Sequence, residues 1–370
     1  MISYVVDIGR VAQYFRNGER VRQLVANPRE DLHFLGQLRR AALPLPMDRQ
    51  APVSDPFPGF RKRDLPALRD RRIAIIASGG SGVLGSVVGV ARVLEEAGVK
   101  PVAYGLCSAS AVFGIPLAAG LSAQEVATAT LALRPAQYID VDYRALATLP
   151  VRLRRGWMGL VRGDRIEQVY RRLLGEITLG ELPTPIWFPL WNIEENRLAY
   201  VGSATHPDLM AARAARMAIA LPTAVQPAQL DGGWWLDGGI VDILPSRPFL
   251  TGDVCDLAIV INGFYAEGFE PDHEPHWRES AFSVLRVAGQ TRFMQHVELA
   301  RRSITDLRSA VPDVIELTPV TYGRVRGAGL YGEFLDNRGW AGYMAAGYRA
   351  AEEVLAGWQP RADRPASAAP

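Results

Sequence analysis

The sequence predicts an α/β fold in which helices cover both faces of a mostly parallel central sheet. Three observations lead to this prediction. Short apolar runs alternate with amphipathic segments along most of the chain. The run 72–78 is bounded by charge and glycine, as buried parallel strands are. A glycine-rich turn joins it to a helical pattern at 87–97 that ends before Gly98.

Further elements follow in chain order. Ser122 and Glu125 form a capping-box pattern that opens a helix. The other expected elements are strands at 101–105, 185–191, 197–201 and 254–261, and helices at 210–220, 280–310 and 340–357.

The sequence divides into three predicted parts. Residues 1–64 are expected to be a helical leader and a proline-rich linker, with five prolines between Leu43 and Phe60. Residues 65–358 are expected to form one α/β domain, and residues 359–370 a disordered Pro/Ala tail.

Composition excludes several classes of protein. With 370 residues, 48% hydrophobic and 22% charged, the chain reads as a globular protein. A net charge of +2 without a basic face argues against a nucleic-acid partner. Cys107 and Cys255 are the only cysteines, so neither a disulfide framework nor a metal cluster is expected. The segment 1–7 lacks the features of a signal peptide, which favours a cytoplasmic location.

The glycine-rich turn has two functional interpretations. Gly80-Ser-Gly-Val-Leu-Gly85 fits the dinucleotide fingerprint G-x-G-x-x-G, which also needs an acidic residue about 20 positions on. The second strand instead ends in Tyr104-Gly-Leu106, without a carboxylate. The alternative is an oxyanion hole, in which amides at a helix N-terminus bind the oxygen of an acyl-transfer intermediate. A plain strand-to-helix turn is the third interpretation.

A nucleophile elbow is predicted where the second strand ends, in Gly105-Leu-Cys-Ser-Ala-Ser-Ala111. If Ser108 is the nucleophile, the flanking positions are Leu106 and Ser110, where glycine is usual. If Cys107 is the nucleophile, the flanking residues are small. The pattern alone leaves both open.

An aspartate with two following glycines, Asp237-Gly-Gly239, provides the third motif. A carboxylate at a strand end can serve as the general base that activates a hydroxyl. By itself, the tripeptide is also a common turn signal.

These three motifs, in this order, resemble the patatin-like phospholipase family over about residues 70–250. The family's oxyanion loop and following helix are similar to Gly79-Gly-Ser-Gly82 and the segment 89–98. Its elbow is similar to 106–111, and in that register Cys107 precedes the nucleophile Ser108. Its D-G-G motif, followed by N-x-P, is similar to Asp237-Gly-Gly and Ile243-Leu-Pro245, with isoleucine where asparagine is usual.

The resemblance implies a three-layer patatin-like fold and a serine acyl hydrolase that uses a Ser–Asp dyad without a cofactor. Asp237 would accept the proton of Ser108, and amides around Gly80, Ser81 and Gly82 would hold the oxyanion. The implied substrates are lipid acyl esters such as phospholipids and lysophospholipids. The alternatives are a non-catalytic patatin-like binding or regulatory protein and a nucleotide-binding oxidoreductase of the Rossmann type.

A basic stretch from Arg152 to Arg172 interleaves arginines with Trp157 and Met158. It fits either an anionic membrane surface, which would make the protein peripheral, or a solvated helix face. The five histidines lie outside the motifs above, and none follows the aspartate in a hydrolase-like context. Because triads are assembled in space, the sequence alone leaves a triad histidine open. The sequence does not indicate an oligomeric state.

Overall fold

The computed structural model describes residues 55–80, 83–142, 158–251, 253–265, 283–320 and 337–360. The predicted helical leader at 1–40 lies outside these residues, as does the tail beyond residue 360. The three predicted parts of the chain therefore stay predictions. None of the helices within the described ranges combines the length and apolar character that crossing a bilayer requires.

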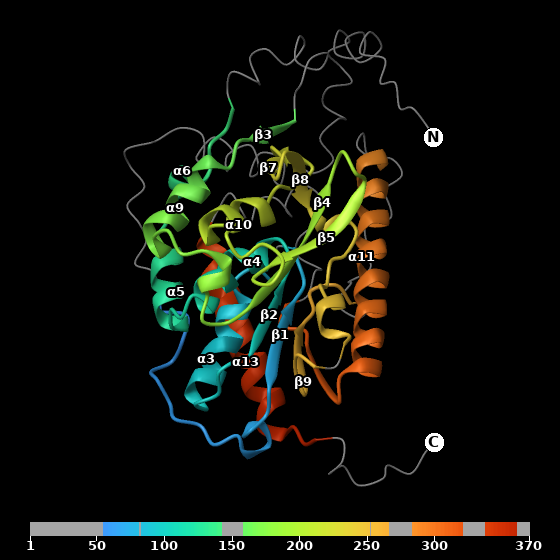
Figure 1. Cartoon of the computed structure of the whole chain (residues 1–370). Coiled ribbons are helices and arrows are strands. Elements are labelled where there is room, and N and C mark those ends of the chain that lie inside the picture. The colour runs from blue at the N-terminus through green and yellow to red at the C-terminus, as the bar shows by residue number, and fades with distance from the viewer. Residues whose placement is uncertain are drawn as a thin grey trace, which may run out of the picture.

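The central sheet has eight strands in the order β10-β9-β1-β2-β4-β8-β7, with β5 also paired to β4 (Figure 1). The strands from β10 to β4 are parallel, whereas β5 and β8 pair antiparallel with β4, and β7 pairs antiparallel with β8. The prediction of a mostly parallel sheet is confirmed. The strands are β1 (Ile73–Ala77), β2 (Ala103–Leu106), β4 (Ile186–Asn192), β5 (Arg197–Gly202), β7 (Ala228–Leu230), β8 (Gly233–Asp237), β9 (Leu257–Ile261) and β10 (Asp313–Leu317), with β3 (Gly159–Val161) and β6 (Thr223–Val225) as a separate pair.

Helices pack on both faces of the sheet, as predicted. The α-helices are α3 (Ser86–Glu96), α4 (Ala109–Ala118), α5 (Ala123–Leu131), α6 (Pro135–Tyr138), α9 (Asp164–Leu174), α10 (Ala211–Ala218), α11 (Ser283–Ala310) and α13 (Trp340–Gly357). The short 3₁₀ segments are η2 (Pro66–Leu68), η4 (Leu179–Glu181), η5 (Gly238–Ile240), η6 (Arg247–Phe249) and η10 (Asn337–Gly339).

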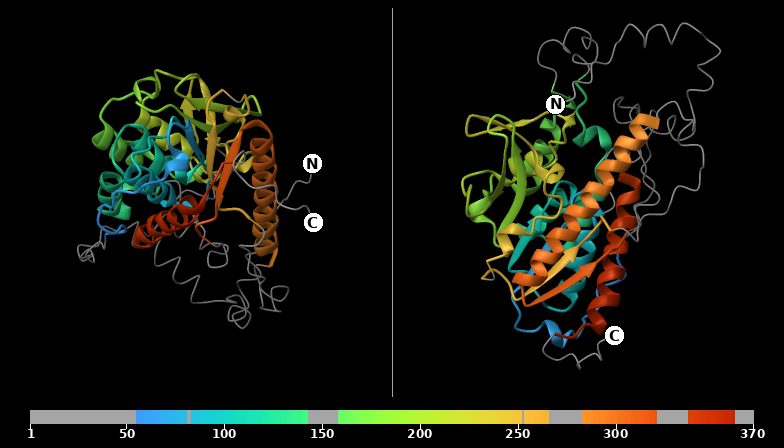
Figure 2. Two further views of the ribbon diagram at one scale, coloured as in Figure 1. Left: turned by 90° about the horizontal axis from the view of Figure 1, so that it is seen from below. Right: turned by 90° about the vertical axis from the view of Figure 1, so that its right-hand side faces the viewer.

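Strand β1 separates two apolar cores. All five of its residues are buried, which explains why its sequence is an unbroken apolar run. Successive side chains of a strand point to opposite faces. Ile73 and Ile75 accordingly enter the larger core with α3, α4, α5 and α13, whereas Ala74 and Ile76 enter the smaller core with α11. Figure 2 shows α11 against one face of the sheet, opposite the helical layer that includes α3 and α13.

Helices α3 and α13 touch through their backbones. A Cβ at Gly89 would lie 2.0 Å from the Met344 carbonyl oxygen, and one at Gly347 would lie 2.1 Å from the Ser86 carbonyl oxygen. Only glycine permits this approach. The C-terminal helix thus supports the helix that begins directly after the glycine-rich turn.

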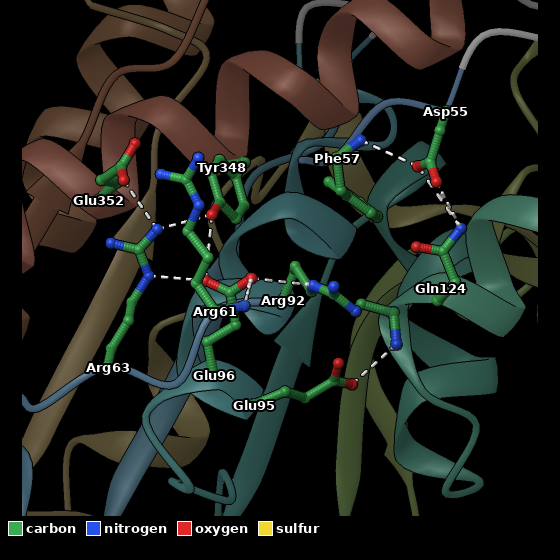
Figure 3. Close-up of polar contacts among 11 residues, drawn as sticks. Asp55, Phe57, Arg61, Arg63, Arg92, Glu95, Glu96, Gln124, Tyr348 and Glu352 are labelled. Atoms are coloured by element: carbon green, nitrogen blue, oxygen red, sulfur yellow. Dashed lines mark hydrogen bonds and ion pairs between the residues drawn. The ribbon is translucent and has the colours of Figure 1, made fainter. Parts of the chain in front are cut away.

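A network of charged residues ties the segment 55–64 to the same two helices (Figure 3). Arg63 donates to the carboxylates of Glu96 and Glu352 and to the hydroxyl of Tyr348. Tyr348 in turn donates to Glu96. Burial acts to raise the pKa of Glu96, but the hydrogen bonds from Arg63 and Tyr348 outweigh it and leave that pKa below its usual range. The carboxylate therefore stays charged and paired.

Candidate active site

Ser108 occupies a strained turn between β2 and α4. Its backbone has φ 53° and ψ −122°, a combination that residues other than glycine rarely adopt. Strain of this kind at the junction of a strand and a helix is the defining feature of a nucleophile elbow. The side chain is 5% exposed and sits at the N-terminus of α4. The strand-to-helix turn predicted at 105–111 is therefore present, with Ser108 at its strained position.

Ser110 closes the elbow by hydrogen bonds. Its Oγ accepts a hydrogen bond from the backbone N–H of Cys107 at 2.9 Å. The hydroxyl can donate to either of two carbonyl oxygens, that of Cys107 at 2.8 Å and that of Ala77 at 3.2 Å. The hydroxyl thus links the turn to itself and to the neighbouring strand β1. A serine in place of the usual glycine is accommodated because its side chain is small and fully bonded.

Leu106 packs over a glycine of the next helix. A Cβ at Gly114 would lie 2.6 and 2.7 Å from the two methyl carbons of Leu106. The space that a flanking glycine usually leaves at an elbow is therefore supplied by Gly114, and the bulky Leu106 fits without displacing Ser108.

We expect Gly114→Ala to destabilise the protein by about 1–3 kcal/mol, because the added methyl overpacks the Leu106 side chain. Urea denaturation measures the loss. In a Leu106→Ala background the same change should cost less, giving a coupling energy of about 1 kcal/mol or more. Gly342→Ala is the matched control, since no atom lies within 4 Å of its Cβ position. Equal costs in the two backgrounds would contradict this packing.

Cys107, the rival nucleophile, points away from the surface. Its thiol is completely buried and lies 3.7 Å from the carbonyl oxygen of Asp242. Burial raises the pKa of the thiol well above its usual value, and the nearby carboxylates of Asp237 and Asp242 add to the effect. A thiol in this setting is a poor nucleophile.

The turn after β8 brings Asp237 against the elbow. The Asp237 side chain accepts a hydrogen bond from the N–H of Gly239 at 2.8 Å. A Cβ at Gly239 would lie 2.9 Å from Cys107 Sγ, and one at Gly238 would lie 2.6 Å from the backbone of Pro189. The two glycines are therefore needed for close packing, and they place Asp237 directly beside Ser108.

The Asp237 carboxyl group is an unusually basic carboxylate. Burial raises its pKa from 3.8 to about 6, against the opposing effects of the Ser108 hydroxyl, the Gly239 N–H and the charge of Arg292. The Asp237 Oδ2 atom is buried and has no hydrogen bond of regular geometry. The Ser108 hydroxyl is nevertheless close enough to favour the charged form of the Asp237 carboxyl group. A base with this pKa can accept a proton near neutral pH.

The glycine-rich turn lies against the same serine. A Cβ at Gly79 would lie 3.0 Å from Ser108 Cβ and 3.0 Å from Ile243 Cδ1. The Gly79 N–H donates to the Ile243 carbonyl oxygen at 3.0 Å, and Gly80 has φ 95°. Ile243, which stands where asparagine is usual, thus fills the space between the loop and the aspartate turn. Ser81 and Gly82 of the predicted oxyanion hole lie outside the described residues.

The strained serine, the buried aspartate and the glycine loop meet at one edge of the sheet. The family model described as patatin-like phospholipase matches residues 75–250. Residues 75–250 are a patatin-like phospholipase domain. The resemblance inferred from the motifs is confirmed, as is the three-layer α/β fold of this patatin-like domain.

Curated relatives match part of the chain. Uncharacterized NTE family proteins of Mycobacterium bovis and Mycobacterium tuberculosis are each 30% identical to the chain over 156 residues. The match covers 39% of this chain and 38% of each relative. The chain thus spans well under half the length of these relatives.

Two solved structures are similar at lower identity. VipD from Legionella pneumophila is 13% identical with a TM-score of 0.41, over 77% of this chain and 66% of VipD. ExoU from Pseudomonas aeruginosa, solved in complex with SpcU, is 15% identical with a TM-score of 0.33, over 65% of this chain and 52% of ExoU.

Two of the five histidines are described, and each has another environment. His206 lies 3.0 Å from Thr205 Oγ1 and 3.7 Å from Asp231, in a polar pocket of about 360 Å³ that Ser108 and Asp237 do not line. His296 packs edge-on against Phe264, and burial lowers its pKa to about 4. Within the described residues, the patatin-like domain therefore has a serine–aspartate pair without a histidine.

The basic stretch is only partly described, because residues 152–157 are not. In the described part, Arg165 donates to two backbone carbonyl groups. Arg171 pairs with Glu167 on the same helix. These contacts are those of a helix surface, and the predicted membrane contact stays a prediction.

Sequence reasoning missed Arg292, whose charge acts on Asp237. No sequence signal marks it, since its distance from Ser108 and Asp237 depends on how α11 packs on the sheet.

Proposed function

We propose that this protein is a serine acyl hydrolase of lipid acyl esters in which Ser108 is the nucleophile and Asp237 the general base. The observation that carries the proposal is the strained backbone of Ser108 next to a buried carboxylate whose pKa is about 6. Both are features of a nucleophile and its base.

In the proposed reaction, Asp237 Oδ2 accepts the hydroxyl proton of Ser108 as Oγ attacks the ester carbonyl carbon. The carbonyl oxygen becomes an oxyanion, held by amides around Gly80, Ser81 and Gly82 and favoured by the N-terminus of the helix that follows. The alcohol leaves with the proton from Asp237, and an acyl-serine remains. Water, deprotonated by Asp237, then releases the fatty acid and restores Ser108.

The lipid substrate class rests on the family to which the domain belongs. Within that class, the proposal covers phospholipids and lysophospholipids. Contact with an anionic membrane surface, and with it peripheral attachment of a cytoplasmic protein, is a further part of the proposal. The alternative function is a non-catalytic binding role. The fit of Leu106, Ser110 and Ile243 around the turn counts against this alternative, because these unusual residues do not displace Ser108.

A fluorophosphonate probe tests the proposal directly. We expect the wild-type protein to be labelled in step with its hydrolysis of short p-nitrophenyl esters, with the label on the peptide that contains Ser108. The labelled residue is identified by mass mapping. A folded preparation that neither takes up the probe nor hydrolyses any ester would reject the hydrolase in favour of the binding protein. Saturable NADH binding would instead support the nucleotide-dependent reading.

A further inference from the structure

Helix α11 runs antiparallel to the strand that follows it. Only residues 311 and 312 separate the end of α11 from the start of β10, and β10 is parallel to β9 and β1. The N-terminal half of α11 must therefore extend toward the carboxyl ends of the strands, where the glycine loop and Ser108 lie. Figure 2 shows the helix following the whole length of this face.

The lengths of helix α11 and strand β10 place Arg292 beyond the carboxyl edge of the sheet. Eighteen residues of helix separate Arg292 from Ala310, which correspond to about 27 Å along the axis. Strand β10 is five residues long, or about 17 Å. Arg292 is thus carried roughly 10 Å past the carboxyl edge of the sheet, the edge at which Ser108 and Asp237 lie.

Packing fixes which face of α11 looks toward the site. Phe264 lies 5.9 Å from Phe293 and 5.0 Å from His296, ring centre to ring centre. Residues four apart share a helix face, so Arg292 lies one turn beyond His296 on that face. The loop that holds Phe264 is in turn bonded to the glycine-rich turn, since the N–H of Gly263 donates to Ser78 Oγ at 3.0 Å.

Arg292 is half-buried. It has neither an ion-pair partner nor a hydrogen-bond partner within the described parts of α11, the sheet and the opposite helices. Other arginines of α11, such as Arg301 and Arg302, are paired with Glu298. The charge of Arg292 is nevertheless felt at the site, because it lowers the pKa of Asp237 and of His296.

We propose that Arg292 binds the anionic group of the ester substrate, a phosphate carried on the alcohol side of the scissile bond. The inference rests on the hydrolase function proposed above and names its substrate class. A guanidinium suits this role because its planar set of donors makes paired, charge-assisted hydrogen bonds to phosphate oxygens. Held in this way, the head group positions the acyl ester over Ser108.

The test compares two soluble substrates with the same acyl chains, dihexanoyl glycerophosphate and uncharged dihexanoylglycerol, both as monomers. We expect Arg292→Gln to lower kcat/KM for the glycerophosphate about tenfold more than for the diglyceride, mainly through KM. Arg292→Lys should recover part of the preference. Arg301→Gln, an exposed arginine of the same helix, should leave both rates as they are.

A binding measurement separates this proposal from the hydrolase itself. Calorimetry in a Ser108→Ala background should show weaker binding of dihexanoyl glycerophosphate when Arg292→Gln is added, whether or not the wild type hydrolyses it. Equal losses for both substrates, together with unchanged binding, would overturn the role of Arg292. So would an effect seen only with diglyceride in anionic vesicles, which would make Arg292 a membrane contact. Hydrolysis that fails while binding still depends on Arg292 would reject only the proposed catalysis.

Discussion

Replacing Ser108 by alanine is expected to lower ester hydrolysis by about 10⁴-fold or more, because the variant lacks the hydroxyl that is proposed to carry the acyl group. Labelling by a fluorophosphonate should disappear in the same variant. The strain at φ 53° belongs to the backbone, so the fold of the elbow should be retained. Initial rates and in-gel labelling of the purified variant measure both effects.

Cys107→Ala is the matched control, one residue away in the same turn. Its thiol is buried and faces the Asp242 carbonyl group, so the variant should still be labelled and should still hydrolyse esters. Circular dichroism checks that both variants are folded. Labelling that survives in Ser108→Ala and vanishes in Cys107→Ala would show that the elbow register is wrong.

Asp237→Asn is expected to have the second largest effect, a loss of about 10⁴-fold in kcat, because the amide cannot accept the proton of Ser108.

The Asp237→Asn variant should be more stable than the wild type at pH 8. The buried carboxylate has its pKa raised from 3.8 to about 6, so its charged form weakens the folded state. That difference corresponds to about 3 kcal/mol at most, which the neutral amide would regain.

The pH dependence of stability follows from the same shift. A carboxyl group with a raised pKa in the folded state contributes stability that is fully present below about pH 4 and is lost as the pH rises through about 6. Thermal melts of wild type and Asp237→Asn should therefore diverge between pH 4 and pH 6. Parallel curves across that range would mean that Asp237 titrates like an exposed aspartate.

Activity should change in the opposite sense over this range. The reaction needs the Asp237 carboxylate, so kcat/KM of the wild type should fall below a pH of about 6. Burial raises the pKa of Asp237 to this value, while the Ser108 hydroxyl, the Gly239 N–H and the charge of Arg292 act to lower it. Arg292→Gln removes a nearby positive charge and should move the acid limb to higher pH.

The sequence predicted most of the sheet, because its strands are short apolar runs between turn residues. The run 72–78 became β1 and the paired runs 185–191 and 197–201 became β4 and β5. The capping box at Ser122 is present. Local sequence patterns determine these elements, so they could be predicted without knowing which segments pack against them. By contrast, β8 depends on antiparallel pairing with β4, and β7 on antiparallel pairing with β8, and neither strand had such a signal.

The nucleophile elbow shows where sequence reasoning stopped and tertiary structure continued. The residues 105–111 predicted a strand-to-helix turn but left Cys107 and Ser108 open, since spacing alone favours whichever has small flanking residues. The structure distinguishes their surroundings through contacts with distant residues. Gly114 makes room for Leu106, and Ser110 bonds across to Ala77.

By itself, the sequence determined the fold class and the order of the three motifs. These follow from periodicity, turn chemistry and glycine spacing, all of which are local, whereas the meeting of the motifs in one site was implied by the family resemblance. Only the tertiary structure decided that Asp237 is buried with a raised pKa, that the Cys107 thiol is enclosed, and that the charge of Arg292 on α11 acts on Asp237. Burial and the approach of charges depend on contacts between segments far apart in the chain, and no local pattern specifies them.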